Sequence, residues 1–243
     1  ENRRNLVTRI ATKLLYPRAQ KVICTSDFIK SQLIGTIGVK PERAIFLPNP
    51  IDCDRVREMA TKKPEIQVER KGTYLVVAVG RLIKAKGFDI LLEAISISRR
   101  CENIELLIVG DGAERQGLEE LIARLDLQSV VTLTGYQENP YPYIASADLF
   151  VLSSRWEGYV NTVIEAMMLG VDIVATDCNS GPGNMLRDKL GYDLVKTESP
   201  EMLSSSILAS LLNPRDTSEF KELVELHRMP TAAANYFGEY NAN

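Results

Sequence analysis

The stretch DLFVLSSRWEGYVNTVIEAMMLG, residues 148–170, decides the fold class of this chain. Its first part, DLFVLSS, is a short apolar run that predicts a buried β-strand. A turn around Gly158 follows, and Asn161 is placed to cap a helix over 162–169, which Gly170 closes. A strand followed directly by a helix is the repeating unit of a parallel α/β sheet.

Two glutamates lie at the start of this predicted helix, Glu157 in the turn and Glu165 one turn into the helix. The free amides of a first helical turn and the positive end of the helix dipole favour a bound phosphate. Carboxylates accept hydrogen bonds from hydroxyl groups. The stretch therefore favours a sugar joined to a phosphate, although Glu165 alone is equally compatible with an ordinary solvated helix residue.

A second stretch, LVVAVGRLIKAKGFDILLEAI at residues 75–95, has the same design. A buried strand ends at Gly80, and Arg81 and Lys86 flank the loop before an amphipathic helix. Parallel α/β sheets bind their ligands at such loops. Arginine forms forked bonds to phosphate oxygens, and lysine adds a point charge. Each cation alone is compatible with a solvated surface charge, but the two stretches together indicate an anion site.

These two signatures resemble those of the retaining glycosyltransferases of family 4, which have the GT-B architecture. In that family a G-R-L-x-x-x-K-G element holds the donor diphosphate, and two glutamates separated by seven residues hold the donor sugar and ribose. The elements stand here as Gly80-Arg81-Leu82 with Lys86-Gly87, and as Glu157 with Glu165. Three further stretches match family elements: GDG at 110–112, VVTLTGY at 130–136 and DCNSGPGNML at 177–186.

The resemblance implies a role for each matched residue. Arg81 and Lys86 would neutralise the diphosphate as it leaves, and Glu157 would accept from the sugar, so these three are the expected catalytic residues. Glu165 would accept from the ribose hydroxyls. The other expected donor-binding residues are Gly80, Gly135, Tyr136, Gly158, Tyr159, Val160, Asn161 and Thr162.

The chain departs from the family pattern at two positions. Val160 stands where the family often has glycine or proline, a change that backbone amides can tolerate. Asn184 replaces the glutamate of the family's G-P-x-E element, which removes one carboxylate and weakens the match there. The resemblance implies no cofactor and no bound metal.

The expected fold is a Rossmann-like, doubly wound parallel α/β sheet with part of a second domain. The expected divisions are a remnant of the acceptor-side domain at 1–52, a linker at 53–72, the donor domain at 73–215, and a C-terminal helix and tail at 216–243. The pattern predicts strands at 21–25, 44–47, 73–79, 104–109, 130–133, 148–152, 172–176 and 193–195, and helices at 26–37, 88–99, 113–125, 162–169, 200–212 and 216–227.

Composition excludes several other classes of protein. The net charge of −3 argues against general nucleic-acid binding. No apolar run reaches the length of about eighteen residues that a membrane span needs. The four cysteines are scattered, which favours a reducing cytoplasm, and Cys24 and Cys178 are expected to be core thiols. The single histidine, His227, is expected on the surface.

The first twenty-one residues are basic, with six cations against Glu1 alone. Leu6, Ile10 and Leu14 recur at helical spacing. A basic amphipathic helix over 3–16 would suit an anionic membrane surface, at the inner face of the membrane, or would pack on a partner domain with its cations solvated. Both interpretations remain open.

The resemblance implies transfer of a sugar from a nucleotide-diphosphate sugar, with UDP favoured, to a glycan or lipid-linked acceptor. Two alternatives stand beside it: a binding module without turnover, and a nucleotide-sugar epimerase or phosphorylase of the same architecture. Because only residues 1–52 resemble the acceptor-side domain, the chain by itself is expected to bind donor without transferring sugar.

Overall fold

The computed structural model describes residues 3–67, 70, 73–178, 186, 192 and 194–241. The strands are β1 (Val22–Cys24), β2 (Ala44–Phe46), β3 (Tyr74–Val79), β4 (Ile104–Val109), β5 (Val131–Leu133), β6 (Leu149–Leu152) and β7 (Asp172–Ala175). The α-helices are α1 (Arg3–Leu15), α2 (Asp27–Gln32), α3 (Cys53–Ala60), α4 (Phe88–Ser98), α5 (Arg115–Arg124), α6 (Tyr141–Ala145), α7 (Asn161–Met168), α9 (Pro200–Leu212), α10 (Lys221–His227) and α11 (Met229–Asn241).

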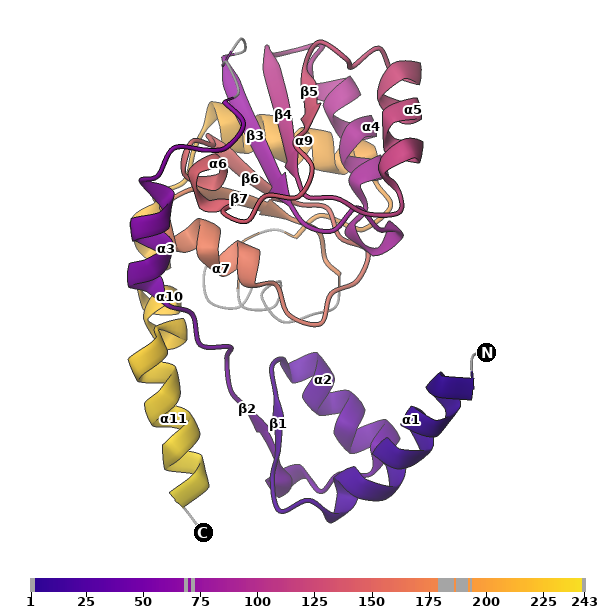
Figure 1. Cartoon of the computed structure of the whole chain (residues 1–243), viewed down its shortest axis with the longest axis vertical. Coiled ribbons are helices and arrows are strands. Elements are labelled where there is room, and N and C mark those ends of the chain that lie inside the picture. Colours follow the sequence, from indigo (N-terminus) through magenta and orange to yellow (C-terminus); the bar gives the residue numbers. More distant parts are fainter. Residues whose placement is uncertain are drawn as a thin grey trace.

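Five strands form one parallel sheet in the order β5-β4-β3-β6-β7, with helices on both faces (Figure 1). Alternate residues of each strand point to opposite faces. Phe150 therefore packs with α6 and α7, while its neighbour Val151 packs with α4 and α9. Burial on both faces explains why the strands are continuous apolar runs. The predicted doubly wound sheet is confirmed.

Residues before the sheet domain form a small unit of their own, in which β1 and β2 pair in parallel. Ser26 caps α2 by accepting a hydrogen bond from the Ile29 amide at 3.1 Å. The core of this unit is a cluster of four buried residues, Cys24, Leu33, Val39 and Ala44. The unit lies below the sheet domain in Figure 1 and matches the strands predicted at 21–25 and 44–47.

The segment predicted as a linker, 53–72, contains the helix α3. Asp52 caps this helix, because its carboxylate accepts a hydrogen bond from the Arg55 amide at 3.0 Å. Cys53 and Val56 are buried, and the helix packs against α6 and α7. A cap and two buried side chains thus hold a helix in a segment that is rich in charged residues.

The C-terminal region differs from prediction in two ways. A further helix, α11, stands where a tail was expected. His227 is fully buried, so its predicted surface position is wrong. The reason is its spacing: Phe220, Leu223, Val224 and His227 share one face of a helix, and that face packs toward α7.

Two local expectations are also settled. Helix α7 begins at Asn161 itself, and Val160 occupies the cap position, so the prediction of Asn161 as N-cap is wrong. Cys24 and Cys178 are buried, as predicted for core thiols. Most of the family-like stretch 177–186, including Asn184, lies outside the described residues.

Candidate functional site

The two signature loops meet at one edge of the sheet. Strands β3 and β6 are neighbours, with Val76 opposite Leu149 and Val77 opposite Phe150. The chain winds outward from β3 to β5 and then returns to β6, so the strand order reverses between these two strands. The carboxyl ends of strands at such a switch point form the crevice where open α/β sheets bind ligands.

Glycines allow the 80–87 loop to pack tightly against the loop after β6. Gly87 has a φ of +62°, and a Cβ there would lie 2.2 Å from the Ser153 carbonyl oxygen. A Cβ on Gly80 would lie 3.1 Å from Lys86 Cε. Gly87 therefore requires glycine, because a Cβ there would meet backbone, whereas at Gly80 the contact is with the movable end of the Lys86 side chain.

Lys86 and Glu157 form the ion pair at the centre of this edge. Lys86 Nζ lies 2.5 Å from Glu157 Oε1, and the side chains are only 18% and 11% exposed. The Ser154 hydroxyl donates to the same Oε1 at 2.6 Å. The predicted phosphate-binding cation and the predicted sugar-binding carboxylate thus pair with each other.

Arg81, the other predicted cation, lies two residues after the end of β3, in the same loop as Lys86, and is exposed. Within the described part of the chain its guanidinium has no hydrogen bond and no ion pair. Its charge is therefore available to an anion that binds at these strand ends.

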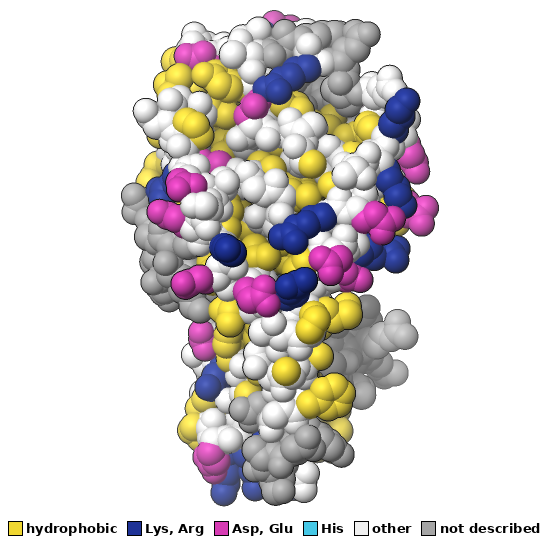
Figure 2. Space-filling view, turned by 90° about the vertical axis from the view of Figure 1, so that its left-hand side faces the viewer, with side chains coloured by type: hydrophobic (Ala, Val, Ile, Leu, Met, Phe, Trp, Pro, Cys, Tyr) yellow, Lys and Arg dark blue, Asp and Glu magenta, His cyan; other side chains and the backbone are white. Residues whose placement is uncertain are grey.

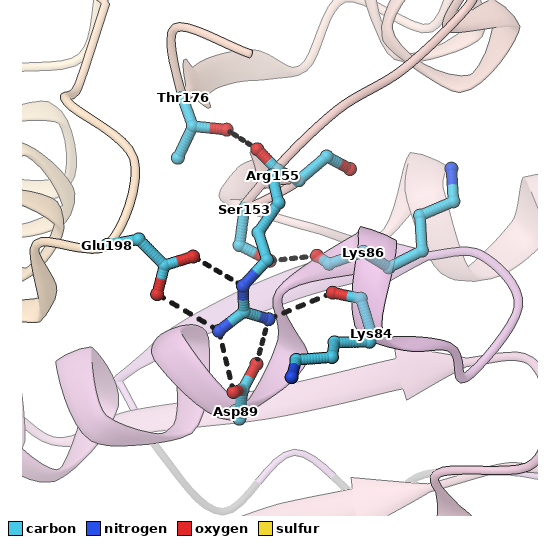
Figure 3. Close-up of polar contacts among 8 residues, drawn as sticks. Lys84, Lys86, Asp89, Ser153, Arg155, Thr176 and Glu198 are labelled. Atoms are coloured by element: carbon cyan, nitrogen blue, oxygen red, sulfur yellow. Dashed lines mark hydrogen bonds and ion pairs between the residues drawn. The ribbon is translucent and has the colours of Figure 1, made fainter.

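Arg155 ties the two loops together, and sequence reasoning missed it (Figure 3). Its guanidinium donates to both oxygens of Asp89 at 2.7 and 2.8 Å, to both oxygens of Glu198 at 2.5 and 3.2 Å, and to the Lys84 carbonyl at 2.9 Å. Its backbone amide donates to the Ala85 carbonyl at 2.8 Å. Its position two residues before Glu157 is the feature of the sequence that could have marked Arg155 as part of the site.

Hydroxyl groups complete this link between loops. Ser153 donates to the Lys86 carbonyl at 2.9 Å. Thr176, just after β7, donates to the Ser154 carbonyl at 2.6 Å (Figure 3). The backbone beside Lys86 and Glu157 is therefore held on several sides before any ligand binds, a form of preorganisation.

Glu165 is a mostly buried carboxyl group on α7. Burial raises its pKa to about 7, although the Tyr141 hydroxyl, 3.5 Å from Oε1, acts in the opposite direction. Burial and the neighbouring Glu165 raise the pKa of Tyr141 to about 12. Glu165 is thus no ordinary solvated helix residue, because its carboxyl group is mostly buried and its pKa is raised to about 7.

The residues between the two glutamates present backbone amides. In the described part of the chain, the amides of Tyr159 and Val160 donate no hydrogen bond. The first-turn amides of α7, at Asn161 and Thr162, have no partner within their helix. The Thr162 hydroxyl oxygen is buried and lacks a hydrogen bond. Together these groups make a helix N-terminus of the kind that can accept an anion.

Glycines also bring the ends of the outer strands close together. Gly110 donates to the Gly135 carbonyl at 2.9 Å, and a Cβ on Gly110 would lie 2.0 Å from the Gly80 carbonyl oxygen. Gly135 and Tyr136 thus share the edge that carries Gly80. The Tyr136 side chain is 76% exposed, which leaves its ring free for a flat ligand.

The sheet edge therefore collects every predicted site residue. A cavity of about 390 Å³ lies elsewhere, behind α7 among residues of α3 and α10, and no predicted site residue lines it. That face carries apolar atoms between cationic and anionic side chains (Figure 2).

Within the described ranges, no cluster of His, Cys, Asp and Glu could hold a metal ion. The same ranges contain no helix long and apolar enough to cross a membrane.

Comparison with known proteins shows the family of this chain. The family described as Glycosyl transferases group 1 matches residues 59–225, and the one described as Glycosyltransferase Family 4 matches residues 1–55. An uncharacterised glycosyltransferase from Methanocaldococcus jannaschii is 32% identical over 192 residues, which cover 75% of this chain and 47% of the relative.

A second relative is the N-acetylgalactosamine-N,N'-diacetylbacillosaminyl-diphospho-undecaprenol 4-alpha-N-acetylgalactosaminyltransferase of Campylobacter jejuni. It is 30% identical over 187 residues, which cover 77% of this chain and 49% of the relative. The chain thus spans about half the length of the curated relatives that it matches.

Solved structures share the fold. Anabaena HepE in complex with UDP and glucose superposes with a TM-score of 0.80 at 20% identity, covering 97% of this chain and 66% of that one. Sucrose-phosphate synthase from Thermosynechococcus elongatus superposes with a TM-score of 0.80 at 22% identity, covering 96% and 61%. At this level of identity the likeness concerns the fold alone.

Proposed function

The chain belongs to the family of glycosyl transferases group 1 and has the GT-B architecture; from this premise we propose that it carries the donor-binding half of a retaining glycosyltransferase. The reaction moves a sugar from a nucleotide-diphosphate sugar, UDP-linked by preference, to a glycan or lipid-linked acceptor. The observation that carries the proposal is the contact of Lys86 with Glu157 at the switch point between β3 and β6, with Arg81 exposed in the same loop as Lys86.

Binding of a diphosphate would change the partners of Lys86 and Glu157, which form an ion pair with each other. A diphosphate attracted by Arg81 would take the ammonium of Lys86 away from Glu157. Glu157 would then have a free oxygen for a sugar hydroxyl, while Ser154 keeps its hydrogen bond to the carboxylate. As the diphosphate leaves, both cations would stabilise its growing charge, which is the electrostatic part of catalysis.

Other groups at this edge of the sheet would hold the sugar, the ribose and the base of the donor. The amides of Tyr159 to Thr162 and the exposed Gly158 would face the β-phosphate or the sugar, and the buried Thr162 hydroxyl would gain a partner. Glu165 would accept from the ribose hydroxyls. The base would lie near Gly135 and Tyr136.

The donor and acceptor classes rest on relatives. HepE was solved with UDP and glucose, and the Campylobacter jejuni relative is named for a diphospho-undecaprenol-linked acceptor. The acceptor side would lie in residues 1–52, which agrees with the Glycosyltransferase Family 4 match at 1–55. Helix α1 offers the exposed apolar residues Ile10, Leu14 and Leu15 for peripheral contact with a membrane that carries the acceptor, on its cytoplasmic face.

Calorimetry against the diphosphates of uridine, guanosine and adenosine tests the proposal directly. We expect binding of UDP in the micromolar to millimolar range, stronger than that of the other two. A chain that binds none of the three at millimolar concentration would refute a nucleotide-sugar site.

Substitutions separate phosphate contacts from the rest. Arg81→Ala and Lys86→Ala should each weaken UDP binding by about 1.5–3 kcal/mol and leave uridine binding nearly unchanged, because each removes a charge-assisted contact. Lys84→Ala is the matched control: Lys84 lies in the same loop, is exposed, and points its ammonium away from that of Lys86 (Figure 3). Equal losses for UDP and uridine would exclude phosphate contacts.

Transfer also needs an acceptor held against the sugar, and such positioning supplies roughly 7–11 kcal/mol of a barrier. The acceptor-side unit of this chain has a single two-stranded sheet. We therefore expect the 243-residue chain to bind donor with at most slow hydrolysis. Robust transfer to an added acceptor by this chain would contradict that expectation.

A further inference from the structure

Two segments far apart in the sequence pair with each other beside the donor site. The Ile51 amide donates to the His227 carbonyl at 2.7 Å, and the Met229 amide donates to the Ile51 carbonyl at 3.1 Å. Residues 49–51 and 227–229, here called the crossing pair, lie where the chain passes between the sheet domain and the lower part of the molecule (Figure 1). Any change in the angle between these two parts therefore requires the backbone of the crossing pair to move.

One side chain of the crossing pair reaches the donor site. His227 is fully buried, and its Nδ1 lies 2.7 Å from the Leu223 carbonyl oxygen, which can only accept. Nδ1 therefore carries a hydrogen, and in the neutral ring Nε2 is left as an acceptor. Nε2 takes a short hydrogen bond from the hydroxyl of Tyr159. Each hydrogen bond in the series from Tyr159 through His227 to Leu223 thus has one donor and one acceptor.

Asn49, at the other side of the crossing pair, makes the second link. Its side-chain amide donates to Asn161 Oδ1 at 3.2 Å. Its backbone also hydrogen-bonds to the Tyr159 hydroxyl. Tyr159 and Asn161 are thus anchored by their side chains to the crossing pair, while their backbone amides lie at the N-terminal end of α7.

We propose that His227 is a positioning residue that couples the crossing pair to the donor loop, residues 157–161, through its hydrogen bond to Tyr159. The proposal rests on the proposed function, because it concerns the binding of a nucleoside diphosphate at that loop. A diphosphate that draws the loop amides toward itself acts on the crossing pair through two side-chain bonds. By thermodynamic reciprocity, the geometry of the crossing pair sets the affinity for the diphosphate.

Binding measurements on the 243-residue chain test the positioning role. Tyr159→Phe and His227→Gln should each weaken UDP binding by about 5- to 10-fold, the value of one buried hydrogen bond, and leave uridine binding within about twofold. The double variant should lose no more than either single variant, because both remove the same bond. A general loss of structure would instead weaken both ligands.

Tyr192→Phe is the matched control. Tyr192 is also buried, and its hydroxyl donates to Asp172 Oδ1 at 2.8 Å, at the start of β7 and away from the donor loop. It should bind UDP like the wild type. Asn161→Ala removes the exposed second link without disturbing the core, and should weaken UDP binding by about 2- to 5-fold even if the His227 variant does not fold.

Hydrogen exchange reads the coupling itself. UDP should slow exchange of the Ile51 and Met229 amides at least about fivefold in the wild type, and much less in Tyr159→Phe, because the hydrogen bonds of the crossing pair then no longer sense the ligand. Wild-type UDP affinity in Tyr159→Phe, or unchanged exchange at these amides in UDP-bound wild type, would overturn the coupling. Failure of the wild type to bind UDP would overturn the proposed function instead.

Discussion

The two parallel sheets of this molecule differ in how completely they are covered. In the five-stranded sheet, β3 has Val76, Val77 and Ala78 fully buried between two layers of helices. In the two-stranded sheet, Ile23 of β1 remains 47% exposed, and the buried cluster has four members. The sheet domain therefore supplies its own core, whereas the N-terminal unit presents apolar surface that other residues would have to cover.

The difference also concerns the polar groups that fix the loops. The sheet domain ties its loops with Arg155 and the carboxylates of Asp89 and Glu198. In the N-terminal unit the counterpart is Arg43, which donates to the carbonyls of Pro17 and Ala19, both at 3.3 Å. A donor site needs rigid supports, which explains why the proposed binding residues gather on the first region.

The largest expected effect is in the core. Phe150→Ala should lower the free energy of unfolding by about 3–5 kcal/mol, because it leaves a cavity at a buried interior strand, β6. Ile23→Ala, in the two-stranded sheet, should cost less than about 1 kcal/mol. Urea unfolding followed by circular dichroism measures both. Similar losses of unfolding free energy at the two positions would contradict the difference between the two sheets.

The next effect is in the loops. Arg155→Met should lower the free energy of unfolding by about 2–3 kcal/mol and also weaken UDP binding, since it removes five hydrogen bonds that hold the loops of Lys86 and Glu157. Arg155→Lys should not restore the loss, because an ammonium lacks the fork. Arg43→Met should cost less than about 1 kcal/mol. Thermal unfolding measures the change in stability, and calorimetry measures the change in UDP binding. Full recovery of both in Arg155→Lys would contradict the role of the guanidinium fork.

Glu165 gives the sheet domain a pH dependence. Its pKa is about 7 in the folded state against 4.5 in the unfolded state, so the folded state binds the proton more tightly. Its contribution is thus most favourable below pH 4.5 and is lost as pH rises through 7, by roughly 1–2 kcal/mol allowing for partial exposure. Glu165→Gln should abolish this loss between pH 5 and 8 in urea titrations. An unchanged slope would show that another group titrates.

Ionisation of Glu165 should also appear in ligand binding. In the proposed function a ribose hydroxyl would donate to this carboxylate, so the affinity for uridine should rise as pH increases through about 7. Uridine avoids the titration of the phosphate itself. Glu165→Gln serves as the control, and its uridine affinity should not depend on pH in this range.

The smallest expected effect on stability is at α1. The double variant Leu14→Ala, Leu15→Ala should change the free energy of unfolding by less than about 0.5 kcal/mol, because both side chains are exposed. It should nevertheless reduce sedimentation with vesicles that contain anionic lipid. Binding that ignores lipid charge and salt would remove the proposed membrane contact and favour a partner domain on this face.

Local patterns predicted most elements of the sheet domain correctly. Strand β4 and helix α9 have the predicted bounds, because long apolar runs and a proline start leave few alternatives. Helix α3 was missed because only Cys53 and Val56 are buried in a charged segment. Asn161 was wrongly placed as a cap because Val160, a poor capping residue, is held there by burial.

The amino-acid sequence by itself determined the alternation of strands and helices, the glycine positions of the loops, and the family, since all of these depend on neighbours along the chain. Tertiary structure alone decided that Lys86 meets Glu157, that Arg155 lies between Asp89 and Glu198, and that His227 is buried against Tyr159. The physical reason is distance along the chain. Periodicity encodes which face of an element is apolar, but a pairing between segments 43 to 71 residues apart depends on strand order and packing, which periodicity does not encode.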